Sequence, residues 1–123
     1  MAKHNFEFEA PDVVSEILFK DLLGHGYSTH ILCAEDAFIR SNVWVGLWYL
    51  RAVSPDETIE RVMQTTRKKK TDIGFTLRGF KSLNGLNSYI YGLGYEFISV
   101  PYFAGGIRRL GPVPSTDRDS EDT

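Results

Sequence analysis

The chain has 123 residues, one cysteine and a formal net charge of −2 at pH 7, and its 42% hydrophobic and 13% aromatic content is that of a globular protein rather than a disordered one. This length suits a single domain with a hydrophobic core, and the lone Cys33 excludes an internal disulfide framework and a cysteine-rich zinc site. The longest apolar run, 43–50, is too short to span a bilayer and no signal-peptide pattern is present, so we expect a cytoplasmic protein with no membrane association.

The charged residues are unevenly distributed along the chain. Residues 1–53 carry four Lys or Arg and seven Asp or Glu, residues 54–110 carry nine and five, and residues 111–123 carry one and four. The middle of the chain is therefore net positive between two negative flanks. This pattern favours a middle segment that faces a polyanion.

The first third of the chain predicts a strand followed by a helix. Residues 5–9 alternate between polar and apolar side chains, which is typical of a short strand. A helix is expected to begin at Pro11-Asp12 and to end at Gly24, a C-terminal glycine cap. Its apolar stripe consists of Val13, Val14, Ile17, Leu18, Leu22 and Leu23.

Residues 25–53 predict two further strands. The first covers 30–34 and is expected to turn at Glu35-Asp36. The second covers 43–50, which is rich in β-branched and aromatic residues, although a buried helix has the same apolar character. Trp44 and Trp48 in this run are expected to be core residues rather than a ligand platform.

Residues 54–57 (Ser-Pro-Asp-Glu) have the pattern of a helix start, with Ser as the N-cap, Pro at the first helical position and Glu as the reciprocal capping acid. Ile59, Val62 and Met63 would form the inner face of this helix. The helix would end in the basic run 67–70, where positive charge suits the C-terminal end of the macrodipole.

Residues 71–110 predict two short helices and a hairpin. Thr71-Asp72 starts the first helix, residues 79–82 form a turn, and the second helix turns its inward residues Leu83, Leu86 and Ile90 to the core. Strands are expected over 95–100 and 107–110 with a turn over 101–106 between them. From residue 111 onward Pro, Ser, Thr and Asp dominate, which predicts a disordered acidic tail.

The order of these elements is that of a winged helix-turn-helix, whose second close helix enters the major groove of DNA while the wing contacts the flanking backbone. Asn pairs with adenine, Ser reaches base edges or phosphate, and Lys and Arg reach guanine or phosphate. The predicted DNA-binding residues are Arg67, Lys68, Lys69, Lys70, Lys81, Ser82, Asn84, Asn87, Arg108 and Arg109.

At these residues the chain resembles the DNA-binding domain of LexA-type repressors. Thr71-Asp72-Ile73 and the run 77–85 are similar to the "T..EIA..LGF.SPNA" pattern that carries the turn and recognition helix of that family, and 94–98 and 106–110 are similar to the two ends of its wing. The resemblance covers residues 56–110 and implies DNA contact by Lys81, Ser82, Asn84 and Asn87.

The sequence departs from that family in several places. Arg78 is an extra residue in the turn, Leu83 replaces the usual proline, the stretch before the wing is about two residues short, and no self-cleavage domain follows.

A second interpretation needs no DNA. Glycines at 74, 79, 85, 92 and 94 are frequent for two short helices and are also typical of loops and bulged strands in an α+β fold. The chain would then be a non-enzymatic protein-binding module, such as a small inhibitor or adaptor that occludes a partner protein. Its binding face would consist of aromatic residues, which are enriched in interface cores: Tyr89, Tyr91, Tyr95, Tyr102 and Phe103.

An enzymatic function finds little support in the sequence. His25 and His30 with Glu35 and Asp36 match no metal-ligand spacing, and Cys33 has no basic neighbour and is expected to be a buried apolar residue. No Walker-type glycine loop or nucleophile elbow is present, and no cofactor is indicated.

The sequence thus predicts a small α+β regulator of transcription that binds double-stranded DNA, and not an enzyme. Residues 1–53 would form an α+β part that packs on, and dimerises, a winged-helix part over 54–110, with 111–123 as the tail. A homodimer is expected because one short recognition helix rarely gives enough affinity.

Overall fold

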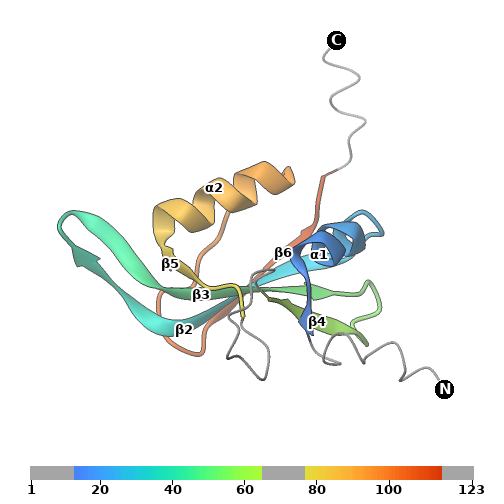
Figure 1. Cartoon of the computed structure of the whole chain (residues 1–123), viewed down its shortest axis with the longest axis horizontal. Helices are drawn as coiled ribbons and strands as arrows, with labels where there is room; N and C mark the ends of the chain where they lie inside the picture. Colours follow the sequence, from blue (N-terminus) through green and yellow to red (C-terminus); the bar gives the residue numbers. More distant parts are fainter. Residues whose placement is uncertain (1–12, 65–76, 115–123) are drawn as a thin grey trace, which may run out of the picture.

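The computed structural model describes residues 13–64 and 77–114 (Figure 1). These residues form a small α+β domain with one mixed six-stranded sheet and two helices, so the α+β class is confirmed. In chain order the elements are β1 (Val13–Val14), α1 (Glu16–Leu23), β2 (Ser28–Arg40), β3 (Val43–Val53), β4 (Glu60–Met63), β5 (Phe80–Ser82), α2 (Leu83–Leu93) and β6 (Ile107–Pro112).

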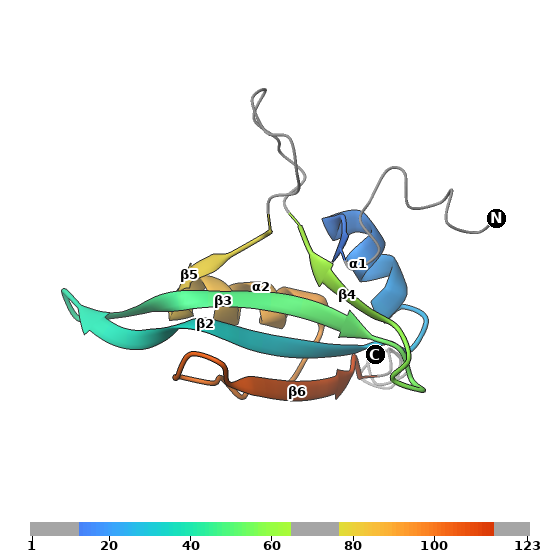
Figure 2. The same cartoon turned by 90° about the horizontal axis from the view of Figure 1, so that it is seen from below.

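The sheet has the strand order β1-β4-β3-β2-β6 (Figure 2). β1 runs parallel to β4, whereas the other pairs are antiparallel. β5 pairs with the same edge of β3 as β4 does, at Val45 and Trp48, while β4 pairs at 51–53. β3, which ends at residue 53, therefore pairs with β4 and β5, which follow it in the chain, and all three belong to one sheet.

Both helices lie on one face of the sheet, and the core lies between the helices and the sheet (Figure 1). Because successive side chains of a strand point to opposite faces, alternate residues of β3 are fully buried. Trp48 is one of them, and its indole N–H donates to the Pro101 carbonyl over 2.8 Å. The largest fully buried residues are Trp48, Phe19, Ile31, Leu50, Met63, Leu86 and Ile90.

The two strands predicted over 30–34 and 43–50 are confirmed as parts of β2 and β3, but the turn predicted at Glu35-Asp36 is wrong. β2 continues through these residues to Arg40, and the pairing with β3 shifts register on either side of Glu35. Such bulges insert residues into one strand without ending it. The chain reverses at Ser41-Asn42 instead, where both residues have positive φ, as a tight hairpin turn requires.

The first helix is confirmed, although it begins later than predicted. Ser15 is its N-cap and accepts a hydrogen bond from Leu18 N–H, and Gly24 is its C-cap as expected. Val13 and Val14 belong to β1 rather than to the helix. The buried face consists of Phe19 and Leu23, whereas Ile17, which was predicted to belong to the inner stripe, is 78% exposed.

The helix predicted from Ser54 is wrong, because residues 54–59 form a compact hydrogen-bonded turn in place of the first turn of a helix. The Ser54 hydroxyl accepts from the N–H groups of Thr58 and Ile59 and donates to Asp56, so the segment forms a compact turn that leads into β4. Together with Thr58, this hydroxyl lowers the pKa of Asp56 to about 2. Met63 is fully buried, as a strand residue.

The predicted wing hairpin is also wrong. Residues 95–100 form no strand, while the strand predicted over 107–110 is confirmed, extends to Pro112 and pairs with β2. The segment after α2 is held by Tyr95, whose buried hydroxyl lies 2.6 Å from the Gly111 carbonyl and 2.9 Å from Thr29 Oγ1. Tyr95 thereby anchors β6 to the end of β2.

Three predicted segments lie outside the described residues. They are the strand over 5–9, the stretch that carries Arg67, Lys68, Lys69, Lys70 and the helix start at Thr71, and residues 115–123 of the acidic tail. The start of the disordered tail at Gly111 is wrong, because Gly111 and Pro112 belong to β6 and Val113 packs against the core.

Candidate nucleic-acid interface

The second helix of the predicted DNA-binding unit exists as α2. Ser82 is its N-cap, with the hydroxyl accepting from Gly85 N–H over 3.0 Å, and Gly94 ends it in the left-handed conformation at φ 106°. Leu86 and Ile90 are buried and Leu83 is half-buried, as predicted. The helix is therefore fixed to the sheet by one face only.

The opposite face of α2 is exposed and carries no charge. Asn84, Asn87, Ser88 and Tyr91 recur at helical spacing on this face, and Gly85 and Gly92 are also exposed. These side chains supply amide and hydroxyl groups that donate and accept hydrogen bonds. The outer face is thus a hydrogen-bonding stripe that contains no carboxylate to repel a polyanion.

The turn predicted over 79–82 is wrong, because Phe80–Ser82 is strand β5. Phe80 pairs with Trp48 and Ser82 with Val45 of β3. A Cβ on Gly79 would lie only 2.9 Å from the terminal Cδ1 of Leu47, so a larger residue here would displace that side chain. α2 consequently follows a sheet strand rather than the first helix of a helix-turn-helix.

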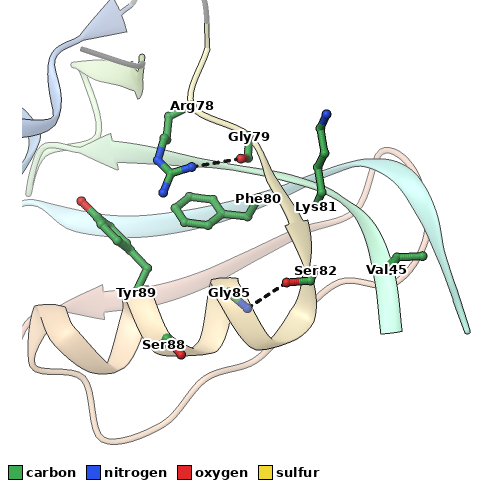
Figure 3. Close-up of a pocket in the computed structure, with 9 residues that line it drawn as sticks. All are labelled: Val45, Arg78, Gly79, Phe80, Lys81, Ser82, Gly85, Ser88 and Tyr89. Carbon is green, nitrogen blue, oxygen red and sulfur yellow. Dashed lines mark hydrogen bonds between the residues drawn. The ribbon is translucent and has the colours of Figure 1, made fainter. Parts of the chain in front are cut away.

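A groove of about 740 Å³ lies between β5 and the N-terminal half of α2 (Figure 3). Lys81 is exposed and points away from the core in Figure 3. Arg78 stacks over the Phe80 ring, 4.4 Å from guanidinium carbon to ring centroid, and donates to the Gly79 carbonyl. The residues that line the groove are Val45, Arg78, Gly79, Phe80, Lys81, Ser82, Gly85, Ser88 and Tyr89.

The charge of this groove is positive. It is lined by two cationic side chains and no carboxylate. Of the residues described over 77–114, four are Lys or Arg and one is acidic, whereas 13–64 contain four and seven. The half of the chain that carries β5 and α2 is therefore the basic half.

The basic run is connected to this groove through the chain. Gln64 and Leu77 form an antiparallel bridge, and Arg78 N–H donates to the Met63 carbonyl. The twelve residues between Gln64 and Leu77 include Arg67, Lys68, Lys69 and Lys70 and both begin and end at this bridge, next to Arg78.

The remaining predicted cations lie elsewhere. Arg108 and Arg109 belong to β6, which is separated from β5 by β3 and β2. Arg109 is also paired with the carboxylate of Glu57. The structure therefore brings Lys81, Ser82, Asn84 and Asn87 together on β5 and α2, but not with Arg108 and Arg109.

Arg78 and Tyr89 are groove residues that the sequence did not assign to the site. The LexA-type pattern makes Arg78 an insertion in a turn, although Arg78, Phe80 and Ser82 alternate with Gly79 and Lys81 as in a strand. Tyr89 is half-buried, and its hydroxyl donates to Glu16 on α1. Burial and the Glu16 carboxylate raise the pKa of Tyr89 well above its ordinary value.

A second polar cluster occupies the sheet where His30, Arg51 and Arg109 pair across β2, β3 and β6. Arg51 donates to His30 Nδ1 over 3.1 Å and pairs with Glu60. Burial, then Arg51 and Arg109, lower the pKa of His30. The buried atoms His30 Nε2 and Arg51 Nε have no hydrogen-bond partner among the described residues.

The remaining features considered from the sequence were the thiol of Cys33, a metal site and a membrane-spanning segment. Cys33 is buried, as predicted, and its thiol donates to the Glu35 carbonyl. Within residues 13–64 and 77–114, no three His, Cys, Asp or Glu side chains are grouped so that they could hold a metal ion, and no helix is long and apolar enough to cross a membrane.

Comparisons with known protein families, with curated proteins and with solved structures found no match.

Proposed function

We propose that this chain is a small sequence-specific DNA-binding regulator in which α2 enters the major groove. The observation that carries the proposal is the outer face of α2: an exposed, uncharged stripe of Asn84, Asn87, Ser88 and Tyr91 beside the cations Arg78 and Lys81. Asn and Ser read base edges, and Lys and Arg neutralise phosphates.

The shape of this end of the molecule supports the proposal. An α-helix with its side chains is about 10–12 Å wide and the major groove of B-DNA is about 12 Å wide, so one exposed helix fits. No described element covers the outer face of α2 (Figure 1). The helix begins beside Lys81, so its positive N-terminal end and this ammonium favour the same phosphates.

The element that supports the proposed recognition helix differs from that of a LexA-type repressor. Here β5 precedes the reading helix and is itself paired with β3, so a sheet edge rather than a helix supports α2. Backbone contacts would come from Arg78 and Lys81 and from Arg67–Lys70, which belong to the segment of the chain between Gln64 and Leu77. Arg108 and Arg109, on the far edge of the sheet, would contribute less.

The first test measures the binding of the full chain to random duplex DNA by fluorescence anisotropy across a salt series. We expect affinity to fall steeply with salt, because each neutralised phosphate releases counterions. Lys81→Ala should flatten the slope of log K against log salt by up to about 0.9, and Lys68, Lys69 and Lys70 changed together to Ala should flatten it further.

Lys20→Ala is the matched control, because Lys20 is an exposed lysine on α1 whose ammonium already pairs with Glu16 at 3.4 Å. It should leave both affinity and slope unchanged. Absence of binding by the unmodified chain at low salt would remove the proposal.

The second test concerns base readout. After a preferred sequence has been selected from a random pool, Asn84→Ala and Asn87→Ala should each reduce preference by about 1–3 kcal/mol while affinity for random DNA persists. Equal losses on selected and random DNA would make both residues backbone contacts.

A second candidate function, a non-enzymatic protein-binding module, is favoured by exposed aromatic side chains. Phe97 and Tyr91 are each 82% exposed and Phe103 is 73% exposed. The aromatic face predicted from sequence is only partly present, because Tyr95 is buried and Tyr89 is half-buried. A chain that binds no DNA but captures a protein partner through these residues would support this function instead.

A further inference from the structure

The outer part of the β2–β3 hairpin, residues 35–46, projects beyond both helices (Figures 1 and 2). We call this segment the arm. Four large apolar side chains on it are substantially exposed: Phe38 by 47%, Ile39 by 57%, Val43 by 45% and Trp44 by 43%. A chain of this size gains no stability from apolar groups left in water, so the arm has the composition of a contact surface.

The exposed groups occupy both faces of the arm. Ile39 is paired with Trp44 on one face, and Phe38 with Val45 and Arg40 with Val43 on the other. Helices cover neither face at this end of the hairpin (Figure 1). A partner that lies flat against the arm therefore covers either the face of Phe38 and Arg40 or the face of Ile39 and Trp44.

The arm is held in place before any partner arrives. Ala37 N–H donates to the Tyr102 carbonyl and Ala104 N–H donates to Asp36, each over 2.7 Å. Trp44 stacks on Tyr102 with ring centroids 5.8 Å apart. With its tight turn at Ser41-Asn42, the arm is a preorganised surface, which reduces the entropy lost on binding.

The charges of the arm are complementary to those of a second arm. Glu35 and Asp36 are exposed at its base, and Arg40 is exposed near its tip on the same strand, with its guanidinium over the Phe38 ring. If two copies align their arms antiparallel about a two-fold axis near Phe38, each Arg40 faces the acids of the other copy. The two Phe38 rings then meet at the axis, as a self-complementary interface requires.

We propose that the arm is the site at which two copies of this chain associate. The exposed apolar residues of the arm, Phe38, Ile39, Val43 and Trp44, are not among the residues assigned to DNA contact, although Val45 at its base lines the groove. The inference therefore does not rest on the proposed function, and its failure would leave DNA binding to be judged separately.

The first experiment is sedimentation velocity on the full chain, without DNA, over a concentration series. We expect a species of twice the 14.0 kDa chain mass that dissociates on dilution. Phe38→Asp should raise the dimer dissociation constant by roughly tenfold or more, because it places two like charges at the two-fold axis. Ile17→Asp, at a 78% exposed isoleucine on α1, should leave it unchanged.

A charge exchange tests the antiparallel arrangement. Arg40→Glu alone and Glu35→Lys alone should each weaken self-association, because each puts like charges opposite one another. An equimolar mixture of the two variants should recover the dimer. In the mixed pair, the carboxylate introduced at position 40 of one copy faces the ammonium introduced at position 35 of the other, and the unmodified Arg40 and Glu35 also face each other.

Each outcome decides the proposal. Far-UV circular dichroism and a urea midpoint equal to that of the unmodified chain establish that each variant is folded. A monomer at every concentration, equal effects of Phe38→Asp and Ile17→Asp, or no recovery in the mixture would overturn the inference. A monomer whose arm binds another protein would assign the surface to that partner.

Discussion

The inner and outer halves of one hairpin differ sharply in what covers them. In the inner half, Ile31, Trp48 and Leu50 are wholly buried beneath the two helices. In the outer half, beyond the register shifts around Glu35, the same two strands remain paired, but Phe38 and Trp44 are nearly half exposed, so the prediction that Trp44 is a core residue is wrong. Backbone pairing is common to both halves, so it does not by itself account for burial.

This difference separates residues that hold the fold together from residues that are available to a partner. Removing a fully buried side chain costs its transfer free energy and leaves a cavity, whereas removing an exposed one costs little. Mutations in the inner half should therefore reduce the stability of the fold. Mutations in the outer half should instead reduce association with a partner.

The largest effect is expected for Trp48→Ala, which removes the bulkiest buried side chain and the hydrogen bond to Pro101. We expect a loss of about 3–5 kcal/mol in the free energy of unfolding, measured by urea denaturation. Trp44→Ala should cost at most about 1 kcal/mol when measured at concentrations too low for association. Similar losses at the two tryptophans would abolish the distinction between the halves.

If Trp48→Ala does not fold, Trp48→Phe provides the measurement, because it keeps an aromatic ring and removes only the indole N–H and part of the volume. It should still be more destabilising than Trp44→Phe.

A smaller effect is expected for Tyr95→Phe, which tests how β6 is attached to the inner half. The change removes the hydroxyl that contacts Gly111 and Thr29 and leaves both partners in a buried place. We expect a loss of about 2 kcal/mol in the same urea assay. Tyr91→Phe is the control, because Tyr91 is 82% exposed, and it should be neutral.

Ser54→Ala tests the turn at the inner end of β3 and should cost about 1 kcal/mol. Its hydroxyl accepts from two backbone N–H groups, and the residue is only 5% exposed. Thr58→Val removes a side-chain hydroxyl from the same turn but no backbone acceptor, so it should cost less. The reverse order would indicate that Asp56, not Ser54, organises the turn.

The smallest effect is expected for the dependence of stability on pH, through His30. The lowered pKa of His30 means that the unfolded chain binds a proton more readily than the folded chain, so stability falls as the pH drops below about 6.5. Protonation of Nδ1 would also break the hydrogen bond from Arg51. His30→Gln should reduce the dependence of the urea midpoint on pH between about 7 and 5, while His25→Gln, at an exposed histidine, should not.

The α+β class, α1, both strands of the hairpin, α2 and the strand after 107 were predictable because their signals are local. Apolar periodicity marks α1 and α2, and β-branched and aromatic residues mark β3. Ser54-Pro-Asp-Glu misled because the same hydroxyl and carboxylate that cap a helix also close a tight turn. Residues 95–100 alternate like a strand, but no neighbouring strand in the described part of the chain pairs with them.

The candidate site was predictable in part for the same reason. Lys81, Ser82, Asn84 and Asn87 are neighbours in sequence and so remain neighbours on β5 and α2. Arg108 and Arg109 were predicted to join them on the assumption of a wing hairpin over 95–110. Such a hairpin depends on long-range pairing, and β6 pairs with β2 instead. The arm was not predictable, because its apolar residues look like core until the extent of the helices is known.

The turn at Ser41-Asn42 has a consequence for the order in which the sheet assembles. Arg40 and Val43 are three residues apart, so the tip of the hairpin closes a very short loop and forms within microseconds. β6 must return from Ile107 to Leu32, and closing so long a loop loses more chain entropy. The half of the hairpin that contributes least to the stability of the finished fold is therefore the half that sets the strand register early.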